Sequence, residues 1–240
     1  MASEGARPAV PRRYDAVLFD VGGTLVDDQD PLGYAAIAEA LGLEGDPDAM
    51  VHALRQAEET FDRPGPRPSA EAYWAVALAG LAGHPVPEAT VGEFVARYRR
   101  LTRSPHLYSD VRRTLDRLAF EGRRLGVVSN SRSAPALYEL LGTVGILGHF
   151  ATVVSSGTEG IAKPDPEIFR RAAQRIGVAP ARAFYVGDLP YTDAKAAAVA
   201  GLGAVWLHRD GTGFGDDPPE ITSLTELPGW IARLEAALVK

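Results

Sequence analysis

The feature that most constrains this chain is an alternation of short apolar runs with helical patterns. Five runs, rich in β-branched or aromatic residues, have the length of buried strands; they cover residues 14–20, 124–130, 150–156, 183–188 and 203–208. Helical patterns lie between most of them, at residues 111–122, 134–145, 166–177 and 192–201. Such alternation produces βαβ units with parallel strands and right-handed crossovers. The sequence therefore predicts an α/β fold with a doubly wound, mostly parallel, Rossmann-like sheet.

A long segment interrupts this alternation between residues 28 and 104, where no convincing strand is found. It is rich in alanine and contains four helical patterns, at residues 31–42, 47–61, 69–82 and 88–101. Proline clusters separate these patterns, which favours a small inserted helical bundle over a long excursion within one domain. The predicted organisation is a disordered tail (1–11), an α/β core domain (12–28 plus 105–240) and an inserted all-α domain (29–104).

The composition excludes several classes of function. The net charge is −6 and the pI is near 5.4, which argues against a nucleic-acid partner because no basic surplus is available to neutralise phosphates. No apolar run approaches the roughly 20 residues that span a bilayer, so no membrane role is expected. The chain has no cysteine, which excludes disulfides and thiol catalysis. The first 13 residues are polar and do not look like a secretory signal, so we expect a cytoplasmic protein.

Polar side chains gather where the predicted strands end. Ligands of open α/β sheets bind beyond the carboxyl ends of the strands, near the switch in strand order. The residues at these ends are Asp20 and Thr24, Ser129 and Asn130, Lys163, and Asp188 and Asp193. Two acids and a hydroxyl form a plausible site for magnesium, which prefers oxygen ligands, and a lysine supplies the positive charge that a phosphoryl oxygen needs. Together these groups suit phosphoryl transfer to a carboxylate.

Four motifs carry a family resemblance. FDVGGTL, VVSNS, KPDPEIF and GDLPYTD follow one another along the chain, and their order and spacing resemble those of the haloacid dehalogenase superfamily, the aspartate-nucleophile hydrolases. Each motif alone is a weak signal, whereas all four in order are strong. The resemblance extends from about residue 14 to 208. The helical insert stands where the phosphatase-like branch of that family carries its helical cap.

The resemblance implies roles for individual residues. Asp20 would be the nucleophile that forms a transient aspartyl-phosphate, and Ser129 and Lys163 would complete the catalytic set. The implied phosphate-binding residues are Gly23, Thr24, Ser129, Asn130 and Lys163. The implied magnesium site consists of Asp20, the backbone carbonyl of Gly22, Asp188 and, from the outer shell, Asp193. Asp193 would act on a metal-bound water or on Lys163, and it could also cap the helix that follows.

The chain departs from the family pattern at Gly22. Phosphatases of the family usually carry an aspartate at this position, which protonates the leaving oxygen and then activates the hydrolytic water. A glycine cannot do this, and proton transfer by a placed group is worth about 10²–10⁴-fold in rate. The acid could instead come from Asp27, Asp28, a residue of the cap or the substrate, and a good leaving group would relax the need for one.

Three functions remain open at this stage. The first is a magnesium-dependent phosphatase or phosphotransferase for a small phosphorylated metabolite, acting as a monomer or homodimer. The second is a 2-haloacid dehalogenase-like hydrolase, whose halide leaving group needs no proton, although such relatives usually lack the GD pair that is intact here. The third is a weakly catalytic binding or regulatory module. A phosphonatase is discarded, because that chemistry uses a cap lysine and residues 28–104 contain none.

Overall fold

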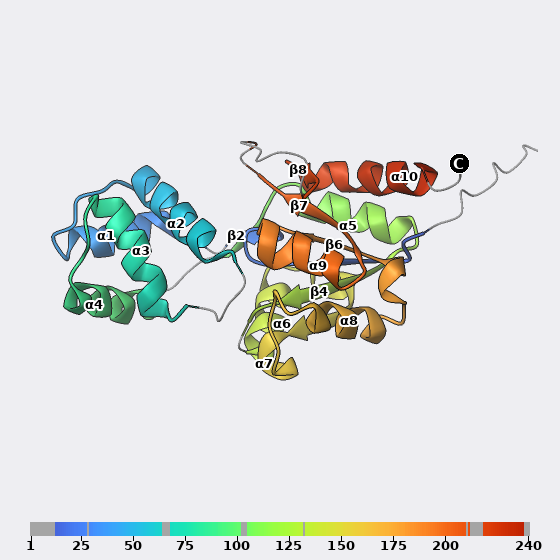
Figure 1. The fold of residues 1–240 in the computed structure, drawn as a ribbon, viewed down its shortest axis with the longest axis horizontal. Helices are drawn as coiled ribbons and strands as arrows, with labels where there is room; N and C mark the ends of the chain where they lie inside the picture. The colour runs from blue at the N-terminus through green and yellow to red at the C-terminus, as the bar shows by residue number, and fades with distance from the viewer. Residues whose placement is uncertain are drawn as a thin grey trace, which may run out of the picture.

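The computed structural model describes residues 13–27, 29–63, 68–101, 105–131, 133–209, 211 and 218–237. The predicted tail (1–11) and Asp28 lie outside the described residues. Figure 1 shows two groups of elements, a sheet flanked by helices and a separate helical bundle.

A parallel sheet forms the larger group. Its strands are β1 (Ala16–Phe19), β4 (Arg124–Ser129), β5 (Phe150–Ser155), β6 (Ala183–Gly187), β7 (Gly203–Leu207) and β8 (Glu220–Ile221). They lie in the order β5-β4-β1-β6-β7-β8, and each neighbouring pair is parallel. The five predicted strands are confirmed, and so is the α/β fold class. Strand β1 is central, with its neighbours β4 and β6 both later in the chain, so the strand order switches beside β1.

Helices cover both faces of the sheet, which explains why its strands are apolar on both sides. Val17 and Phe19 of β1 pack into one core, whereas Ala16 and Leu18 pack into the other. The first core also contains side chains of α5 (Val111–Phe120), α6 (Ala134–Thr143) and α10 (Leu227–Ala237). The second core contains side chains of α8 (Pro166–Arg175) and α9 (Ala196–Val199).

Shorter elements complete the sheet's connections. The four-residue helix α7 (Ser156–Glu159) follows β5. Single turns of 3₁₀ helix cover Leu147–His149, Pro180–Arg182 and Leu224–Glu226. Where a regular helix was expected over 192–201, the structure has a π-helical segment, Pro190–Lys195, followed by α9. We predicted no element after residue 208, so β8 and α10 are additions that the apolar patterns did not reveal.

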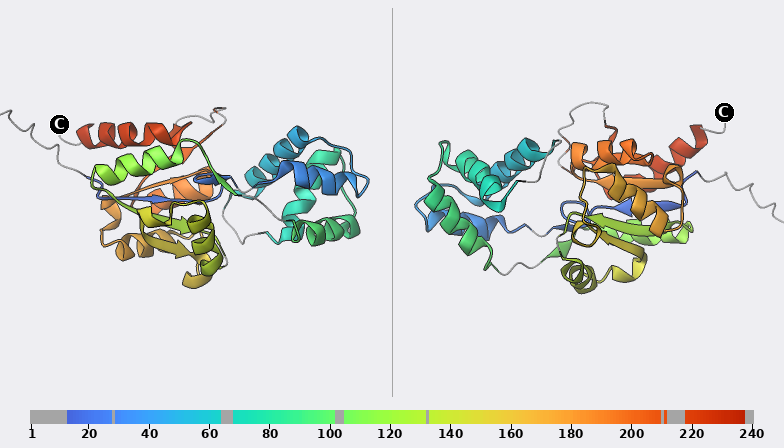
Figure 2. Two further views of the ribbon diagram at one scale, coloured as in Figure 1. Left: turned by 180° about the vertical axis from the view of Figure 1, so that it is seen from behind. Right: turned by 60° about the horizontal axis from the view of Figure 1, so that its bottom comes forward.

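The bundle contains α1 (Pro31–Glu39), α2 (Pro47–Phe61), α3 (Ala70–Ala82) and α4 (Glu88–Tyr98). It has its own apolar core, in which the ring of Trp74 contacts those of Tyr34, Phe94 and Tyr98 at centroid distances of 4.5 to 5.2 Å. Figure 2 shows the molecule from two further directions, and in both views the bundle lies to one side of the sheet and of the helices that flank it. The four predicted helices are therefore present, and they share one apolar core.

Capping residues explain where the helices of the bundle begin. Asp30, Asp46 and Ser69 each accept a hydrogen bond from the backbone three residues later, and Pro31 and Pro47 follow the two aspartates directly. Aspartate and serine are preferred at the N-cap and proline at the first helical position. The first and last helices end earlier than predicted, at Glu39 and Tyr98 instead of residues 42 and 101.

A small antiparallel ribbon joins the bundle to the sheet. Strand β2 (Val26–Asp27) leaves the core and pairs with β3 (His106–Leu107), which returns to it. We did not predict this ribbon, because two-residue strands carry no readable alternation. Through this pairing, the strand that leads to the bundle and the strand that returns from it lie side by side, beyond the carboxyl end of β1.

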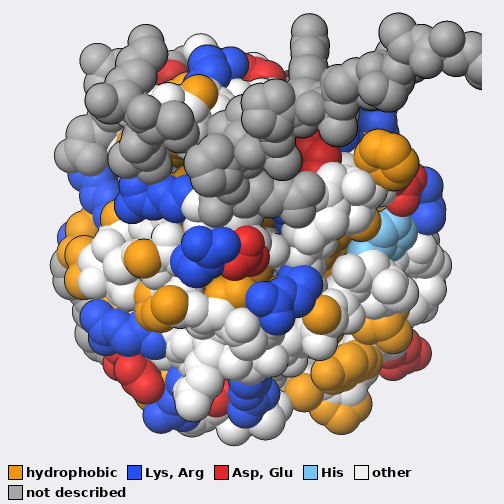
Figure 3. All heavy atoms as spheres, turned by 90° about the vertical axis from the view of Figure 1, so that its right-hand side faces the viewer, with side chains coloured by type: hydrophobic (Ala, Val, Ile, Leu, Met, Phe, Trp, Pro, Cys, Tyr) orange, Lys and Arg blue, Asp and Glu red, His pale blue; other side chains and the backbone are white. Residues whose placement is uncertain are grey.

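Among the described residues, no helix is long and apolar enough to cross a membrane. Figure 3 shows one face of the molecule, on which basic side chains are scattered among acidic, apolar and uncharged ones in the part that the structure describes.

Candidate active site

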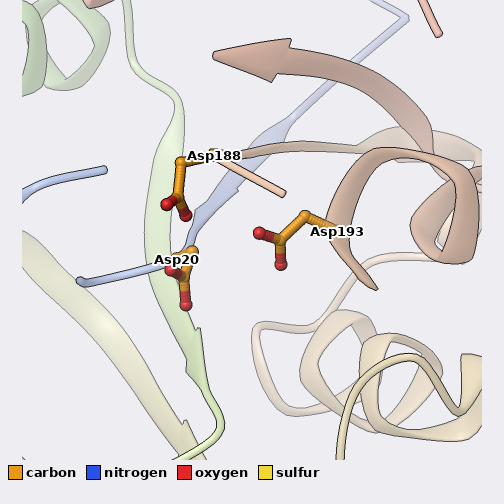
Figure 4. Close-up of side chains that lie close together, drawn as sticks. All are labelled: Asp20, Asp188 and Asp193. Atoms are coloured by element: carbon orange, nitrogen blue, oxygen red, sulfur yellow. The ribbon is translucent and has the colours of Figure 1, made fainter. Parts of the chain in front are cut away.

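Three carboxylates converge at the carboxyl end of the central strands. Asp20 directly follows β1, Asp188 directly follows β6, and Asp193 lies in the π-helical segment after it. One carboxylate oxygen of each residue lies within 4.8 Å of the others. Figure 4 shows the three side chains pointing toward a common space. We call Asp20, Asp188 and Asp193 the acid cluster.

Lys163 neutralises part of the acid cluster. Its Nζ donates to Oδ1 of Asp20 and to Oδ1 of Asp193, in both cases at 2.6 Å. Lys163 is only 3% exposed, so water screens these ion pairs weakly. The ammonium group thus lies between the first and the last of the predicted site motifs and holds their acids together.

Tyr185 is a buried member of the site that we did not predict. Its hydroxyl accepts a hydrogen bond from Nζ of Lys163 at 3.0 Å and donates to Oδ1 of Asp193 at 2.8 Å. The other oxygen of Asp193, Oδ2, accepts from the backbone N–H of Leu189 at 3.1 Å. Both oxygens of Asp193 therefore have protein partners. A tyrosine among the apolar residues AFYVG was the available signal, because a buried hydroxyl needs a polar partner.

The second motif positions Lys163 through its backbone. The Asn130 side chain donates to the carbonyl of Lys163 at 3.0 Å and accepts from its N–H at 2.8 Å. The Asn130 amide is thus bonded to the backbone of the third motif. Ser129 ends β4 and is partly exposed beside it, so the structure brings Ser129 to the same edge of the sheet.

The glycine turn (22–24) packs directly against Asp188. Gly23 has a φ of 69°, and a Cβ at this position would lie 2.1 Å from Oδ2 of Asp188. Only glycine tolerates both the left-handed backbone and this approach. Thr24 donates from Oγ1 to Oδ1 of Asp188 at 3.3 Å. The indole N–H of Trp206 donates to the carbonyl of Asp188 at 2.8 Å, which fixes the backbone of that acid.

Burial and mutual repulsion dominate the electrostatics of the acid cluster. Burial raises the pKa of Asp20, and the charge of Asp193 adds to this, although Lys163 opposes the shift. The pKa of Asp188 is raised well above 3.8 by burial and by the charges of Asp20, Asp193 and Glu58. Burial would lower the pKa of Lys163, but Asp193 and Asp20 outweigh it and raise that pKa. The site thus has more negative charge than Lys163 can balance.

These residues fit a magnesium ion. The excess negative charge is what a divalent cation would neutralise, and oxygen atoms are the donors that magnesium prefers. The Asp188 carboxylate accepts a hydrogen bond from the neutral hydroxyl of Thr24, whereas both oxygens of Asp193 are engaged by Lys163, Tyr185 and the backbone of Leu189. The donor set therefore suits a cation at Asp20 and Asp188, with Asp193 in a supporting position.

Among the acids that could stand in for the one missing at Gly22, two have other partners. Asp27 belongs to the ribbon, where its carboxylate lies 3.7 Å from Nε2 of His106 and accepts from the N–H of Gln29. Asp62 accepts from the backbone N–H groups of Tyr191 and Thr192, both at 2.7 Å. Asp28 lies outside the described residues.

Glu58 is the acid of the bundle whose charge reaches the site. It lies on α2 one helical turn before Asp62, is partly exposed, and accepts a hydrogen bond from the Gln29 side chain at 3.0 Å. Its charge contributes to the raised pKa of Asp188. Sequence reasoning named a cap residue as one source of the missing acid but could not say which, because helix α2 carries acids on more than one face.

Comparisons with known proteins identify the family of the chain. A family model described as haloacid dehalogenase-like hydrolase matches residues 14–201. A phosphoserine phosphatase of Thermus thermophilus is 36% identical over 153 residues, which are 64% of this chain and 59% of that protein. A phosphoglycolate phosphatase of Nitrosococcus oceani is 32% identical over 232 residues, which are 91% of this chain and 97% of that protein.

The fold has solved counterparts as well. The structure resembles that of a HAD-hydrolase of Bacillus subtilis bound to magnesium, with a TM-score of 0.68 and 21% sequence identity, over 92% of this chain and 99% of that one. The family model covers all four motifs and both linkers of the bundle. This chain therefore belongs to the haloacid dehalogenase-like hydrolases.

Proposed function

We propose that this hydrolase is a magnesium-dependent phosphatase or phosphotransferase that acts on a small phosphorylated metabolite through an aspartyl-phosphate on Asp20. The observation that carries the proposal is the buried contact of Asp20 with Lys163 beside Asp188. A carboxylate nucleophile, a fixed cation and an oxygen-rich cation site are the parts that phosphoryl transfer requires. The relatives named phosphoserine and phosphoglycolate phosphatases support a phosphate ester as substrate.

In the proposed reaction, different residues carry out the attack on phosphorus, the binding of the phosphoryl oxygens and the binding of magnesium. Lys163 bonds Oδ1 of Asp20, so we assign the attack on phosphorus to Oδ2. The new Oδ2–P bond forms as the bond from phosphorus to the leaving oxygen breaks, and water then cleaves the aspartyl-phosphate and releases inorganic phosphate. Lys163 and Ser129 hold the phosphoryl oxygens. Magnesium, held by Asp20, Asp188 and the carbonyl of Gly22, would supply positive charge for the phosphoryl group.

Glu58 is the residue to which we assign the leaving-group proton. The Gln29 bond directs its carboxyl group, and its charge acts on Asp188. Glu58 gives its proton to the leaving oxygen in the first step and takes one from the attacking water in the second. This assignment rests on the position of α2, because the contact of Asp62 with residues 191–192 holds the end of that helix against the core.

The bundle (29–104) serves in this proposal as a cap. Its hinge is the β2–β3 ribbon, and Asp62 makes one of its contacts with the core. Closure of a cap excludes water and completes a site around the bound substrate. The part of the substrate beyond the phosphate would contact the cap, and this part decides which metabolite is accepted.

The test uses 4-nitrophenyl phosphate with and without magnesium. We expect turnover that EDTA abolishes and that Asp20→Asn reduces by at least about 10³-fold, since the substituted side chain cannot accept the phosphoryl group. An activity that survives EDTA or the Asp20→Asn change would contradict the proposal. The matched control is Asp116→Asn, a change at an exposed carboxylate that pairs with His149.

The two other functions predict different results in assays of their own. A dehalogenase releases chloride from a 2-chloro acid without added metal. A binding module captures a phosphorylated ligand but turns over no member of a phosphate panel. Either result, obtained with a folded protein, would replace the phosphatase proposal.

A further inference from the structure

Arg209, just after β7, is bonded to the backbone of the glycine turn. Its Nε donates to the carbonyl of Gly23 at 3.1 Å, and its Nη2 donates to the carbonyl of Thr24 at 2.6 Å. The guanidinium group also lies over the ring of Tyr108, 3.8 Å from its centroid. Arg209 thus spans the distance between the turn after β1 and the segment in which the bundle returns to the core.

Asp110 anchors the other side of this guanidinium. It accepts from Nη1 and Nη2 of Arg209 at 3.0 and 3.1 Å, in a two-pronged pair. It also accepts from the N–H of Leu224 at 2.8 Å and from the hydroxyl of Ser223 at 3.0 Å. Burial would raise the pKa of Asp110, but the Arg209 and Leu224 bonds hold it below its ordinary value. The carboxylate is therefore charged and tied to the core at neutral pH.

The two carbonyls belong to the turn that sets the distance between the first and fourth motifs. Gly23 lies so close to Asp188 that no Cβ fits between them, and Thr24 donates to the same carboxylate. Gly22, whose carbonyl is assigned to magnesium under the proposed function, directly precedes them. A shift of the turn by a fraction of an ångström would therefore change the cation site itself.

We propose that Arg209, held by Asp110, is a positioning residue that fixes the glycine turn for magnesium binding; this inference rests on the proposed function. Arg209 does not bind the substrate or the cation. Its planar guanidinium can bond two carbonyls and a carboxylate at once, which the single ammonium group of lysine cannot reproduce. Asp110 and Tyr108 both follow strand β3, so their contacts with Arg209 and Leu224 also tie the end of that strand to the core.

The experiment compares Arg209→Lys with Arg171→Lys as a matched control. Arg171 also bonds a backbone carbonyl and a carboxylate, those of Glu159, but it lies on α8. Magnesium alone is titrated into each protein by calorimetry, and kcat and KM for 4-nitrophenyl phosphate are measured at saturating magnesium. Changes in residues that support metal ligands typically cost 10–100-fold in affinity or activity, so we expect the magnesium Kd of Arg209→Lys to rise by about 10-fold or more, kcat to fall, and KM to change little.

The outcomes separate the inference from the function on which it rests. Equal magnesium affinity and kcat in Arg209→Lys and Arg171→Lys would overturn the inference and leave the phosphatase proposal intact. A wild-type protein that binds no magnesium would overturn both. If Arg209→Lys does not fold, Asp110→Asn is measured in its place. This change removes the anchoring charge but keeps Arg209, and an unchanged magnesium Kd in this variant would likewise overturn the inference.

Discussion

At the scale of single residues, the buried carboxylates of the acid cluster repel one another, and a bound cation would reduce this repulsion. Asp188 is buried beside Asp20 and Asp193, and its pKa is raised well above 3.8. A carboxyl group with a raised folded-state pKa binds its proton more tightly in the folded than in the unfolded protein. The free energy of unfolding therefore falls as the pH rises through that pKa. Without magnesium, ionisation of Asp188 therefore opposes folding.

Asp188→Asn should make the magnesium-free protein more stable at neutral pH. The asparagine removes the charge and still offers an oxygen to Thr24. Removing a buried charge that lacks a full partner is worth about 1–2 kcal/mol, and about 2–4 °C accompanies each kcal/mol in a domain of this size. We expect a rise in Tm of about 2–8 °C that shrinks as the pH is lowered, and no stabilisation by added magnesium. The measurement is a thermal melt with and without the ion. A lower Tm than that of the exposed control Glu44→Gln would contradict this expectation.

Glu58→Gln should make the rate depend on the leaving group. Proton donation is worth about 10²–10⁴-fold when the leaving oxygen is basic and little when it is not. We therefore expect a loss of about 10²-fold with an alkyl phosphate and of less than about threefold with 2,4-dinitrophenyl phosphate. Steady-state rates with both substrates test this. The control is Glu59→Gln, its exposed neighbour, and an equal loss with both substrates would rule out the assigned role.

The residues of the site could be predicted only where they belong to motifs. Asp20, Lys163 and Asp188 end strands or follow them, and the structure brings them together at one sheet edge. Tyr185 and Arg209 could not be found in this way. Each acts through a contact between segments far apart in the chain, and their neighbours in the sequence are apolar or lie outside any motif. The sequence alone showed that Gly22 replaces the usual aspartate of the family. The position of Glu58 near the acid cluster could be found only from the structure.

At the scale of elements, α2 is a helix through which the bundle contacts the edge of the sheet that carries the acid cluster. The first N–H groups of a helix have no partner within it. Asp62, at the end of α2, accepts hydrogen bonds from two of them, those of Tyr191 and Thr192. A carboxylate there also interacts favourably with the positive end of the helical segment. One side chain thus caps an element of the core from outside that element.

Asp62→Ala should loosen this contact and with it the start of the π-helical segment. Hydrogen bonds to a charged group are worth about 1.5–3 kcal/mol each, so their loss should speed amide exchange at Tyr191 and Thr192 by about 10-fold or more. Hydrogen exchange followed by NMR measures this directly, with the amides of β6 as an internal reference. Exchange rates equal to those of the wild type would show that the contact does not hold the segment.

Element boundaries were predictable where local chemistry marks them. The predicted starts of the first two helices, at residues 31 and 47, agree with the structure, in which the Asp-Pro pairs at 30–31 and 46–47 mark them. The β2–β3 ribbon could not be predicted, since it is held by pairing between Val26 and Leu107 and not by a pattern within either strand. The π-helical segment could not be predicted either, because the alanine-rich residues that follow it, in α9, favour an ordinary helix over the whole predicted range 192–201.

At the scale of the whole molecule, the apolar core of the bundle is separate from the two cores of the sheet. Trp74 is the centre of the bundle core and is 3% exposed. Trp74→Ala should destabilise the bundle by about 3–5 kcal/mol, because the large cavity cannot be refilled. We expect calorimetry to resolve a low-temperature transition, with amide exchange accelerated in α1–α4 but not in β1 or β6. A single transition that shifts as a whole would show that the cores unfold together. Val51→Ala, at an exposed position of α2, is the control.

The central position of β1 in the sheet has a consequence for folding during synthesis. Ala16 pairs with Arg124 on one side and Ala183 on the other, so both partners of the first strand leave the ribosome long after it does. Domains tend to fold as units during synthesis, and the whole bundle emerges before either partner. The nascent chain therefore holds a folded bundle next to an unpaired apolar strand that ends in Asp20. Asp20 joins Lys163 and Asp188 only when translation is nearly complete, so β1 stays without its sheet partners through most of synthesis.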